Sequence, residues 1–337
     1  MPLKTRILSM FRPTAVVAAA AALALGAAVA PAHAAYPERV ITLVAPYAAG
    51  GPSDIIARLI GDSMSKTLGQ QIVVENVTGA GGTLGAARVA RADPDGYTLL
   101  IHHVALAASA SLYSDLTYDT ATAFRPLGVI NGGPMLLAAK NGYPAKDARE
   151  LLAKLKAEGP SIAVAHAGVG SNAYLCAVLL QRALDVKFNL ISYRGTGPAM
   201  NDLMGGQVDV LCDQSTTAVP PALAGKIKPY AVSSKERLAA VKDLPTLDEA
   251  GLKGFEFTIW HGLYAPKGVP DEAAAKINAA LKIALKDPKI VARFAEVGTT
   301  VFPDAEQTPE AHKARFEREI EVWRKALAGA EEQKAQK

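Results

Sequence analysis

Short apolar runs alternate with helical patterns in the first part of the chain. A β-branched run at 40–44 predicts a strand, and apolar residues at helical spacing over 55–64 predict a helix. A second strand is predicted at 72–74, a second helix at 84–90 and a third strand at 97–101. Strands that alternate with helices are typical of parallel sheets. We therefore expect an α/β lobe here.

The same order of elements restarts downstream. The pattern predicts a strand at 161–165, a helix at 172–184 and a strand at 189–192. A short helix that ends at 205–206 and a strand at 208–211 follow. The two series predict two similar α/β lobes, although no close sequence repeat relates them.

Three helices are predicted to close the chain, at 271–285, at 288–297 and from Thr308 onward. Thr308 has the character of an N-cap, and Pro309 and Glu310 suit the first helical turn. An apolar stripe follows at helical spacing, which we interpret as core packing: Phe316, Ile320, Trp323 and Leu327.

The N-terminal residues have the three parts of a secretory signal peptide. A basic lead (Lys4, Arg6 and Arg12) precedes an uncharged apolar run at 15–30, and small residues surround position 33. The alternative is a membrane anchor, but the run is shorter than the roughly 20 residues that span a bilayer. We expect residues 1–34 to be removed after Ala34, which places the mature protein in the periplasm.

Charge excludes one large class of function. The chain has 36 basic and 32 acidic residues, and only basic residues leave with the leader, so 33 basic residues face 32 acidic ones in the mature protein. A nucleic-acid-binding protein needs a dense basic face. We therefore expect no nucleic-acid partner, and roughly 300 mature residues suggest two domains.

Cysteine and histidine usage predicts no metal and no cofactor. The two cysteines, Cys176 and Cys212, exclude a four-cysteine metal site. In an oxidising compartment they could form one disulfide bond, and the alternative is a pair of buried thiols. The sequence lacks the nucleotide-binding motif GxxxxGK(S/T) and the nucleophile motif GxSxG.

Glycine loops carry the candidate chemistry. Glycines follow predicted strands at 50–51, 79–82, 168–170 and 195–197. Ligands of parallel sheets bind at the carboxyl ends of the strands, where glycine amides and helix N-termini attract anions. One such loop is more simply a tight turn, but four together favour an anion site, and a carboxylate suits such neutral donors.

Enzyme signals are weak by comparison. His102, His103 and His166 could act as bases in a periplasmic hydrolase, yet isolated histidines are more often pocket or turn residues. We predict no catalytic residue.

Several segments together resemble one known family, the extracytoplasmic solute receptors of tripartite tricarboxylate transporters, or Bug family. They are PYAAGGPSDIIAR at 46–58, VEN at 74–76 with GAGG at 79–82, DPDGYTL at 93–99, GVGS at 168–171, YRGTGPA at 193–199, DLMGGQVD at 202–209 with LCDQ at 211–214, and WHGLYAP at 260–266. The resemblance covers essentially all of the mature chain, and the set is specific although each piece is short.

The resemblance implies an α/β fold of the two-lobed periplasmic-binding-protein type (type II, Venus flytrap) with hinge-crossing strands. Residues 35–137 and 260–337 would form lobe 1, and residues 138–259 would form lobe 2. It also implies a monomeric, non-enzymatic protein that captures a small organic carboxylate and delivers it to a membrane permease. A ligand sensor that feeds a signalling partner would share these features. An aromatic diacid, an aliphatic diacid and an acidic amino acid all remain open as ligands.

Mapped residue by residue, the resemblance predicts a binding site shared by both lobes. Lobe 1 would contribute Tyr47, Ala49, Gly50, Ser53, Gly81, Gly82, His102 and His103, and lobe 2 would contribute Gly170, Ser171, Asn172, Arg194, Thr196 and Asp213. The chain departs from the family at Ala48-Ala49, where a proline often precedes the paired glycines. Asp213 is unexpected beside an anion, and it could hold water, bind a ligand hydroxyl or amine, or orient loop amides. Trp260 could border the ligand or pack in the hinge.

Overall fold

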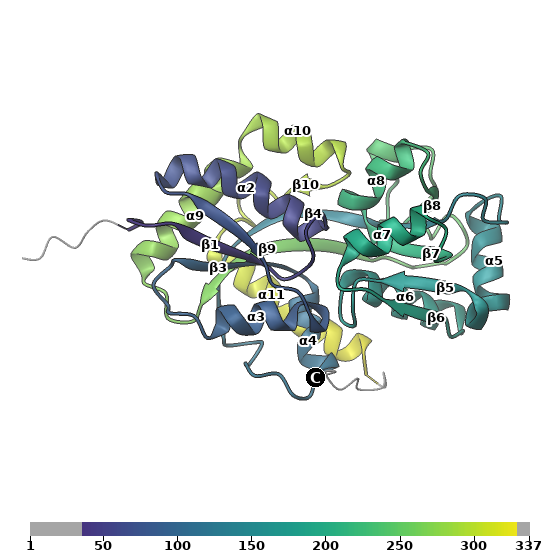
Figure 1. Ribbon diagram of the computed structural model, residues 1–337, viewed down its shortest axis with the longest axis horizontal. Coiled ribbons are helices and arrows are strands. Elements are labelled where there is room, and N and C mark those ends of the chain that lie inside the picture. Colours follow the sequence, from purple (N-terminus) through teal and green to yellow (C-terminus); the bar gives the residue numbers. More distant parts are fainter. Residues whose placement is uncertain (1–35, 329–337) are drawn as a thin grey trace, which may run out of the picture.

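A computed structural model describes residues 36–328, which form two lobes joined by long strands (Figure 1). The predicted signal peptide lies outside the described residues. Within them, no helix is both long and apolar enough to cross a membrane. A single path of hydrogen-bonded strands runs through both lobes in the order β2-β1-β3-β9-β4-β7-β5-β6, with β10 and β8 attached to β4.

Lobe 1 is a mixed sheet covered by helices on both faces. Its strands are β1 (Ile41–Ala45), β2 (Ile72–Asn76), β3 (Thr98–His103), the first part of β4 (Phe124–Ala139), β9 (Thr258–Pro266) and β10 (Thr300–Val301). Its helices are α2 (Pro52–Leu68), the 3-10 turn η1 (Ala80–Gly82), α3 (Thr83–Ala90), α4 (Ala105–Leu112), α9 (Asp271–Leu285), α10 (Pro288–Glu296) and α11 (Pro309–Ala326). Strands β1, β2 and β3 are parallel, whereas β9 runs antiparallel to β3.

Lobe 2 repeats this architecture with fewer elements. Its strands are the end of β4, β5 (Ala163–His166), β6 (Asn189–Ser192), β7 (Val210–Gln214) and β8 (Lys228–Val232). Its helical segments are α5 (Ala148–Glu158), η2 (Gly159–Ser161), α6 (Asn172–Leu184), α7 (Thr196–Met204), α8 (Ser215–Leu223) and η3 (Ala239–Val241). The predicted pair of α/β lobes is confirmed.

Strand β4 connects the lobes. It is 16 residues long and pairs with β9 as far as Pro134, then with β7 and β8 from Met135 onward. In Figure 1 both β4 and β9 run through the region between the lobes. The predicted fold class, with strands that cross a hinge, is therefore confirmed. The proposed lobe limits at 137/138 and 259/260 remain predictions.

Local sequence signals explain where several helices begin and end. Helix α2 has Pro52 in its first turn and ends at Gly69, whose φ of 70° is the left-handed conformation that glycine adopts readily. Thr308 is the N-cap of α11, because its side chain accepts a hydrogen bond from the amide of Ala311 at 3.1 Å. Three elements coincide with their predicted limits: α6, β6 and α9.

The apolar stripe of α11 packs into the core, as predicted. Phe316, Trp323 and Leu327 are buried in the cluster that also contains Trp260 and Tyr264 of β9. The ring of Trp260 lies 5.6 Å from that of His312 on α11. Trp260, a residue of the crossing strand β9, therefore packs against the C-terminal helix, as the hinge alternative predicted.

A disulfide bond joins Cys176 on α6 to Cys212 on β7, with the Cα atoms 6.2 Å apart. The bridge predicted as one of two alternatives is present. It ties together two elements of lobe 2 that begin or end at the interlobe surface.

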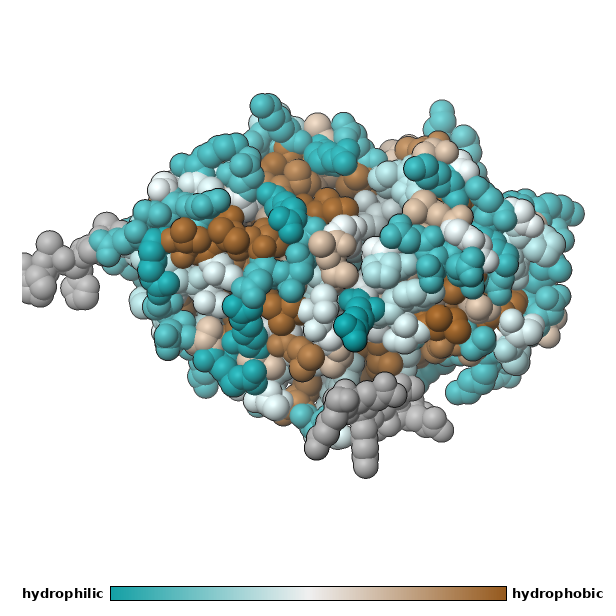
Figure 2. All heavy atoms as spheres, in the orientation of Figure 1, coloured by the Kyte–Doolittle hydropathy of each residue, from teal (hydrophilic) through white to brown (hydrophobic). Residues whose placement is uncertain are grey.

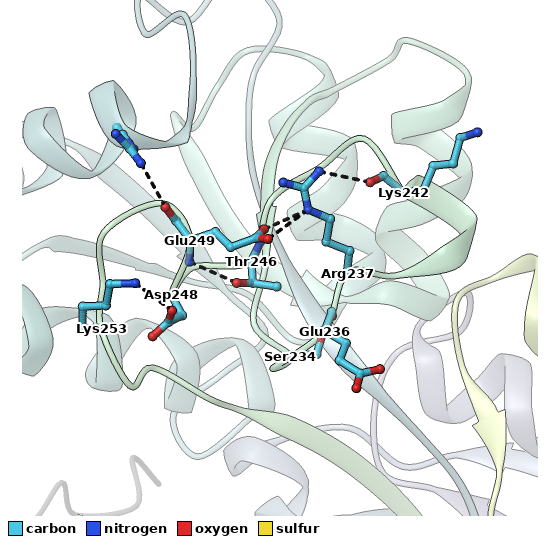
Figure 3. A network of polar contacts seen from close by, with 9 residues as sticks. Ser234, Glu236, Arg237, Lys242, Thr246, Asp248, Glu249 and Lys253 are labelled. Carbon is cyan, nitrogen blue, oxygen red and sulfur yellow. Dashed lines mark hydrogen bonds and ion pairs between the residues drawn. The ribbon is translucent and has the colours of Figure 1, made fainter.

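A polar network orders the segment between β8 and β9 on the outside of lobe 2 (Figure 3). Thr246 and Glu249 bond reciprocally: the Thr246 hydroxyl accepts from the Glu249 amide at 3.1 Å, and the Glu249 carboxylate accepts from the Thr246 amide at 2.9 Å. This is the capping-box pattern that satisfies free amides at the start of a turn. Arg237 donates to the same carboxylate at 2.9 Å. The network holds the segment that leads into the second crossing strand.

Candidate functional site

The candidate site is a small enclosed cavity between the lobes. About 220 Å³ there is free of protein atoms, a figure that includes open solvent at the mouth. It is lined by Tyr47, Pro52, Ser53, His103, Ala167, Ser171, Asn172, Ala173, Thr196 and Gln214. Four helices begin at this lining, namely α2, α6, α7 and α8. Helix N-termini present unbonded amides and a positive dipole end, so the cavity favours an anion.

Lobe 1 contributes a wall of stacked rings. The rings of Tyr47 and His103 are stacked with centroids 4.9 Å apart, and His102 meets His103 edge-on at 4.9 Å. The Tyr47 hydroxyl donates to the carbonyl of Gly81 at 2.6 Å, so its proton is already used. This wall therefore supplies shape and apolar contact more than hydrogen bonds.

The histidines of this wall are neutral. Burial lowers the pKa of His102 and of His261 to about 3, and it also lowers the pKa of His103 well below its usual value. His102 Nδ1 accepts from the amide of His103 at 2.9 Å, and His103 Nδ1 accepts from the amide of Ala105 at 3.3 Å. Both bonds fit neutral rings of His102 and His103 that carry the proton on Nε2.

His166 is also neutral and hydrogen-bonded to the backbone, so it has no feature of a catalytic base. It is buried, which lowers its pKa, and its Nδ1 accepts from the amide of Gly168 at 3.2 Å. The Ser171 hydroxyl, the nearest nucleophile along the chain, accepts from the amide of Tyr174 as the N-cap of α6. No hydrogen bond between a serine and a histidine is present in residues 36–328. No group of histidine, cysteine and acidic residues that could hold a metal ion is found in the same range.

Two polar side chains of the lining are buried without a partner. Asn172 is 2% exposed, and neither its amide nitrogen nor its amide oxygen has a hydrogen-bond partner within the protein. The hydroxyl of Ser53, 1% exposed, is in the same condition. Leaving such a group unsatisfied costs about 1–3 kcal/mol. The two groups lie on opposite lobes, where a bound molecule could satisfy both.

Asp213 lies behind the cavity rather than in its lining. Its carboxylate accepts from the hydroxyls of Thr196, at 3.1 Å, and of Thr217. Burial raises the pKa of Asp213 to about 6, although these hydrogen bonds oppose the shift. Asp213 therefore orients the hydroxyl of Thr196 at the start of α7. The roles considered from the sequence (holding water, binding a ligand group or orienting loop amides) stay predictions.

The lobes touch around the cavity, so the conformation is closed. The Tyr113 hydroxyl of lobe 1 donates to the carbonyl of Val169 in lobe 2 at 2.7 Å. A Cβ atom on Gly81 would lie 1.7 Å from the same carbonyl oxygen, and one on Gly195 would lie 2.8 Å from Ala48. Glycine at these positions allows the two backbones to approach. In Figure 2, much of the strip where the lobes meet has the pale colours of intermediate hydropathy.

The structure brings many of the residues predicted for the site to the cavity. Six of the fourteen line it: Tyr47, Ser53, His103, Ser171, Asn172 and Thr196. Gly81 and Gly170 face Val169 and Tyr113 at the interlobe contact, Ala49 faces Gly197, and Gly82 packs against Tyr47 and His102.

Four predicted residues lie elsewhere or are otherwise engaged. Arg194 lines a separate hollow with Tyr113 and Tyr118. The amide of Gly50 donates to the Asp54 carboxylate at 3.0 Å, so it is not free for a ligand. His102 and Asp213 lie behind the lining. Pro52 lies within the PYAAGGPSDIIAR segment that carried the resemblance, although it was not singled out. Ala167, Ala173 and Gln214 were not predicted, and of these only Gln214 had a usable signal, since it ends the LCDQ segment.

A model of the tripartite tricarboxylate transporter family receptor matches residues 56–325 of the chain. Among solved structures, the periplasmic binding protein BugD is 43% identical, with a TM-score of 0.86, and the match covers 89% of this chain and 100% of that one.

Two further solved structures contain ligands. MatC from Rhodopseudomonas palustris, with bound malate, is 41% identical with a TM-score of 0.84, over 87% of this chain and 100% of that one. An R. palustris protein with adipate is 30% identical with a TM-score of 0.82, over 87% and 97% of the two chains. The folds therefore agree over both lobes.

Proposed function

Because the chain belongs to the receptor family of tripartite tricarboxylate transporters, and to its Bug group, we propose that it captures a small organic carboxylate in the interlobe cavity and presents it to a membrane permease. Members of this family are periplasmic solute-binding receptors and not enzymes, and they work with such permeases. We propose that this chain acts as a monomer.

One observation carries the proposal: two buried, unpartnered polar side chains, Ser53 and Asn172, face one cavity from opposite lobes. Helix N-termini surround them, which provides positive potential without a lysine or arginine in the lining. A dicarboxylate would place one end near the start of α2 and the other near the starts of α6 and α7. Malate in MatC and adipate in the R. palustris protein support this ligand class.

Bridging by the ligand explains closure. A molecule that contacts both lobes binds the closed state better than the open one, and it shifts the population toward closure. The permease would then distinguish loaded from empty receptor by the closed surface.

Calorimetry with a panel of mono- and dicarboxylates tests the site. Asn172→Ala should weaken binding of the best ligand about 5- to 20-fold, because it removes a buried hydrogen-bonding group. The matched control is Asn141→Ala, an exposed residue that bonds the carbonyl of Gly225 away from the cavity. It should bind as the wild type does. If no carboxylate binds, or if both variants bind equally well, the proposed site is wrong.

A further inference from the structure

The Thr196 hydroxyl donates its hydrogen to a protein group, the Asp213 carboxylate. Thr196 lines the cavity, and its oxygen lies 3.1 Å from Asp213 Oδ1. An ionised carboxylate can only accept hydrogen bonds, so the proton between the two must come from threonine. The Thr196 oxygen can then offer a ligand only its lone pairs. It acts as an acceptor in a site that otherwise presents mostly donors.

Asn172 adds a second acceptor. Its amide oxygen is buried and unpartnered, as is its amide nitrogen. The nitrogen can donate to a ligand carboxylate, but the oxygen cannot, because carboxylates have no hydrogen to give. A plain dicarboxylate would therefore leave the asparagine oxygen without a partner and place its own oxygens against the lone pairs of Thr196.

We propose that the cavity selects dicarboxylates that carry a hydroxyl group on the carbon chain, with Thr196 and the Asn172 oxygen as the acceptors of its proton. This inference rests on the proposed function and narrows its ligand class. Thr196 is the specificity-determining residue, and Asp213 is the positioning residue that sets the direction of its hydrogen bond.

A hydroxyl suits this position better than an ammonium group. Among residues 36–328, no acidic side chain lines the cavity, and the two oxygens of Asp213 behind it already accept from Thr196 and Thr217. The starts of α2, α6, α7 and α8 supply positive potential around the same space. A cation would lose hydration there without gaining an ion pair.

Matched ligand pairs test the selectivity. Calorimetry at pH 7.5 compares succinate with each enantiomer of malate, glutarate with each enantiomer of 2-hydroxyglutarate, and adds aspartate. In at least one pair, one enantiomer of the hydroxy acid should bind about 5- to 100-fold more tightly than its plain counterpart, since it satisfies a buried acceptor. Aspartate should bind more weakly than that malate enantiomer.

The outcomes separate the two proposals. If plain and hydroxylated acids bind equally, or if aspartate binds best, the selectivity inference fails while carboxylate capture stands. If none of the acids binds, both proposals fail.

Two substitutions locate the selectivity. Thr196→Val keeps the shape of the side chain but removes the oxygen, so the ratio of affinities within the selective pair should fall to about 1- to 3-fold. Thr196→Ser keeps the oxygen and should retain most of the ratio. Melting temperatures of both variants report whether they fold. A valine variant that folds and still prefers the hydroxy acid would contradict the role of Thr196, and so would a folded serine variant that has lost the preference.

Discussion

The two walls of the cavity are built on different principles. The wall from lobe 1 consists mainly of rings that are hydrogen-bonded to the backbone of the same lobe. Tyr47 donates to the carbonyl of Gly81, and His102 accepts from the amide of His103. The wall from lobe 2 consists of hydroxyl and amide side chains at helix starts, and a disulfide bond behind it joins α6 to β7. Lobe 1 therefore gives the site its shape, and lobe 2 gives it most of its hydrogen bonds.

This difference shows how a neutral surface can be made specific. Rings with lowered pKa values stay uncharged, so they neither attract nor repel a second anion. The hydrogen-bonding groups must then be held in place, because a hydroxyl rotates freely unless it is bonded. Ser171 bonds the amide of Tyr174, and Thr196 bonds Asp213. Three predictions test the contrast between the lobes, in order of expected effect.

Reduction of the disulfide should destabilise lobe 2 and leave lobe 1 unaffected. The bridge spans a sequence separation of 36 residues, and closing a loop of this length stabilises a fold by about 4 kcal/mol in the chain-entropy model. Urea unfolding with and without reductant measures the change, with hydrogen exchange to assign it to a lobe. The double variant Cys176→Ala/Cys212→Ala should give the same urea unfolding curve with and without reductant. Identical unfolding curves for oxidised and reduced wild type would show that the bond contributes nothing.

Gly195→Ala should oppose closure without unfolding either lobe. The new methyl group would lie 2.8 Å from Ala48 across the interface, and overpacking of this kind costs about 1–3 kcal/mol. We expect carboxylate affinity to fall about 5- to 100-fold, with an unchanged melting temperature for the empty protein. Small-angle scattering should show a more open ligand-bound form.

The control for closure lies within one lobe. Gly61→Ala on α2 places a methyl group 3.4 Å from Ile72, an ordinary contact, so its affinity should equal that of the wild type. Wild-type affinity in the Gly195 variant would mean that the closed contact is not required for binding.

The pH dependence of ligand affinity should come from titration of a lobe 2 residue, Asp213, and not from the histidines of lobe 1. The pKa values of His102 and His261 are about 3, so both rings stay neutral from pH 6 to 8 and do not change the affinity over this range. Asp213 has a pKa of about 6, and a nearby anion favours its protonated form. Binding of succinate, which has no hydroxyl group to donate to Thr196, should therefore tighten as the pH falls from 8 to 6, by about fivefold if the ligand raises this pKa by roughly one unit.

Asp213→Asn separates this effect from titration of the ligand itself. The variant cannot ionise at position 213, so its affinity should change with pH only through the titration of succinate itself. If the wild type and the variant show the same pH profile, Asp213 is not coupled to the site.

Much of the fold could be predicted from local patterns, and the reason is that helices are specified locally. The limits of α6 and α9 follow from residues within each helix and its caps, and the N-cap of α11 is formed by Thr308 three positions before its donor. The glycine loops were also visible, because a strand that ends in glycines before a helix is a continuous segment. These signals placed six site residues around one cavity.

Strand β4 shows why local patterns were not enough. It contains Pro126, Pro134 and several glycines, and these residues normally interrupt strands, so the pattern alone predicted no strand there. The segment is extended because β9, more than 100 residues later in the chain, pairs with it from Phe124 to Pro134. Only the resemblance to a family suggested crossing strands.

The sequence by itself determined most of the helices and the glycine-rich strand ends, and it favoured a small anion as ligand, because each depends on residues close together in the chain. It did not predict α4, α5 or α8. Tertiary structure alone decided which groups have partners. It removed Arg194 from the central cavity, engaged the amide of Gly50 with Asp54, and left both amide atoms of Asn172 unbonded. It also turned the Thr196 hydroxyl toward Asp213, because burial and hydrogen-bond direction depend on neighbours that only folding brings together.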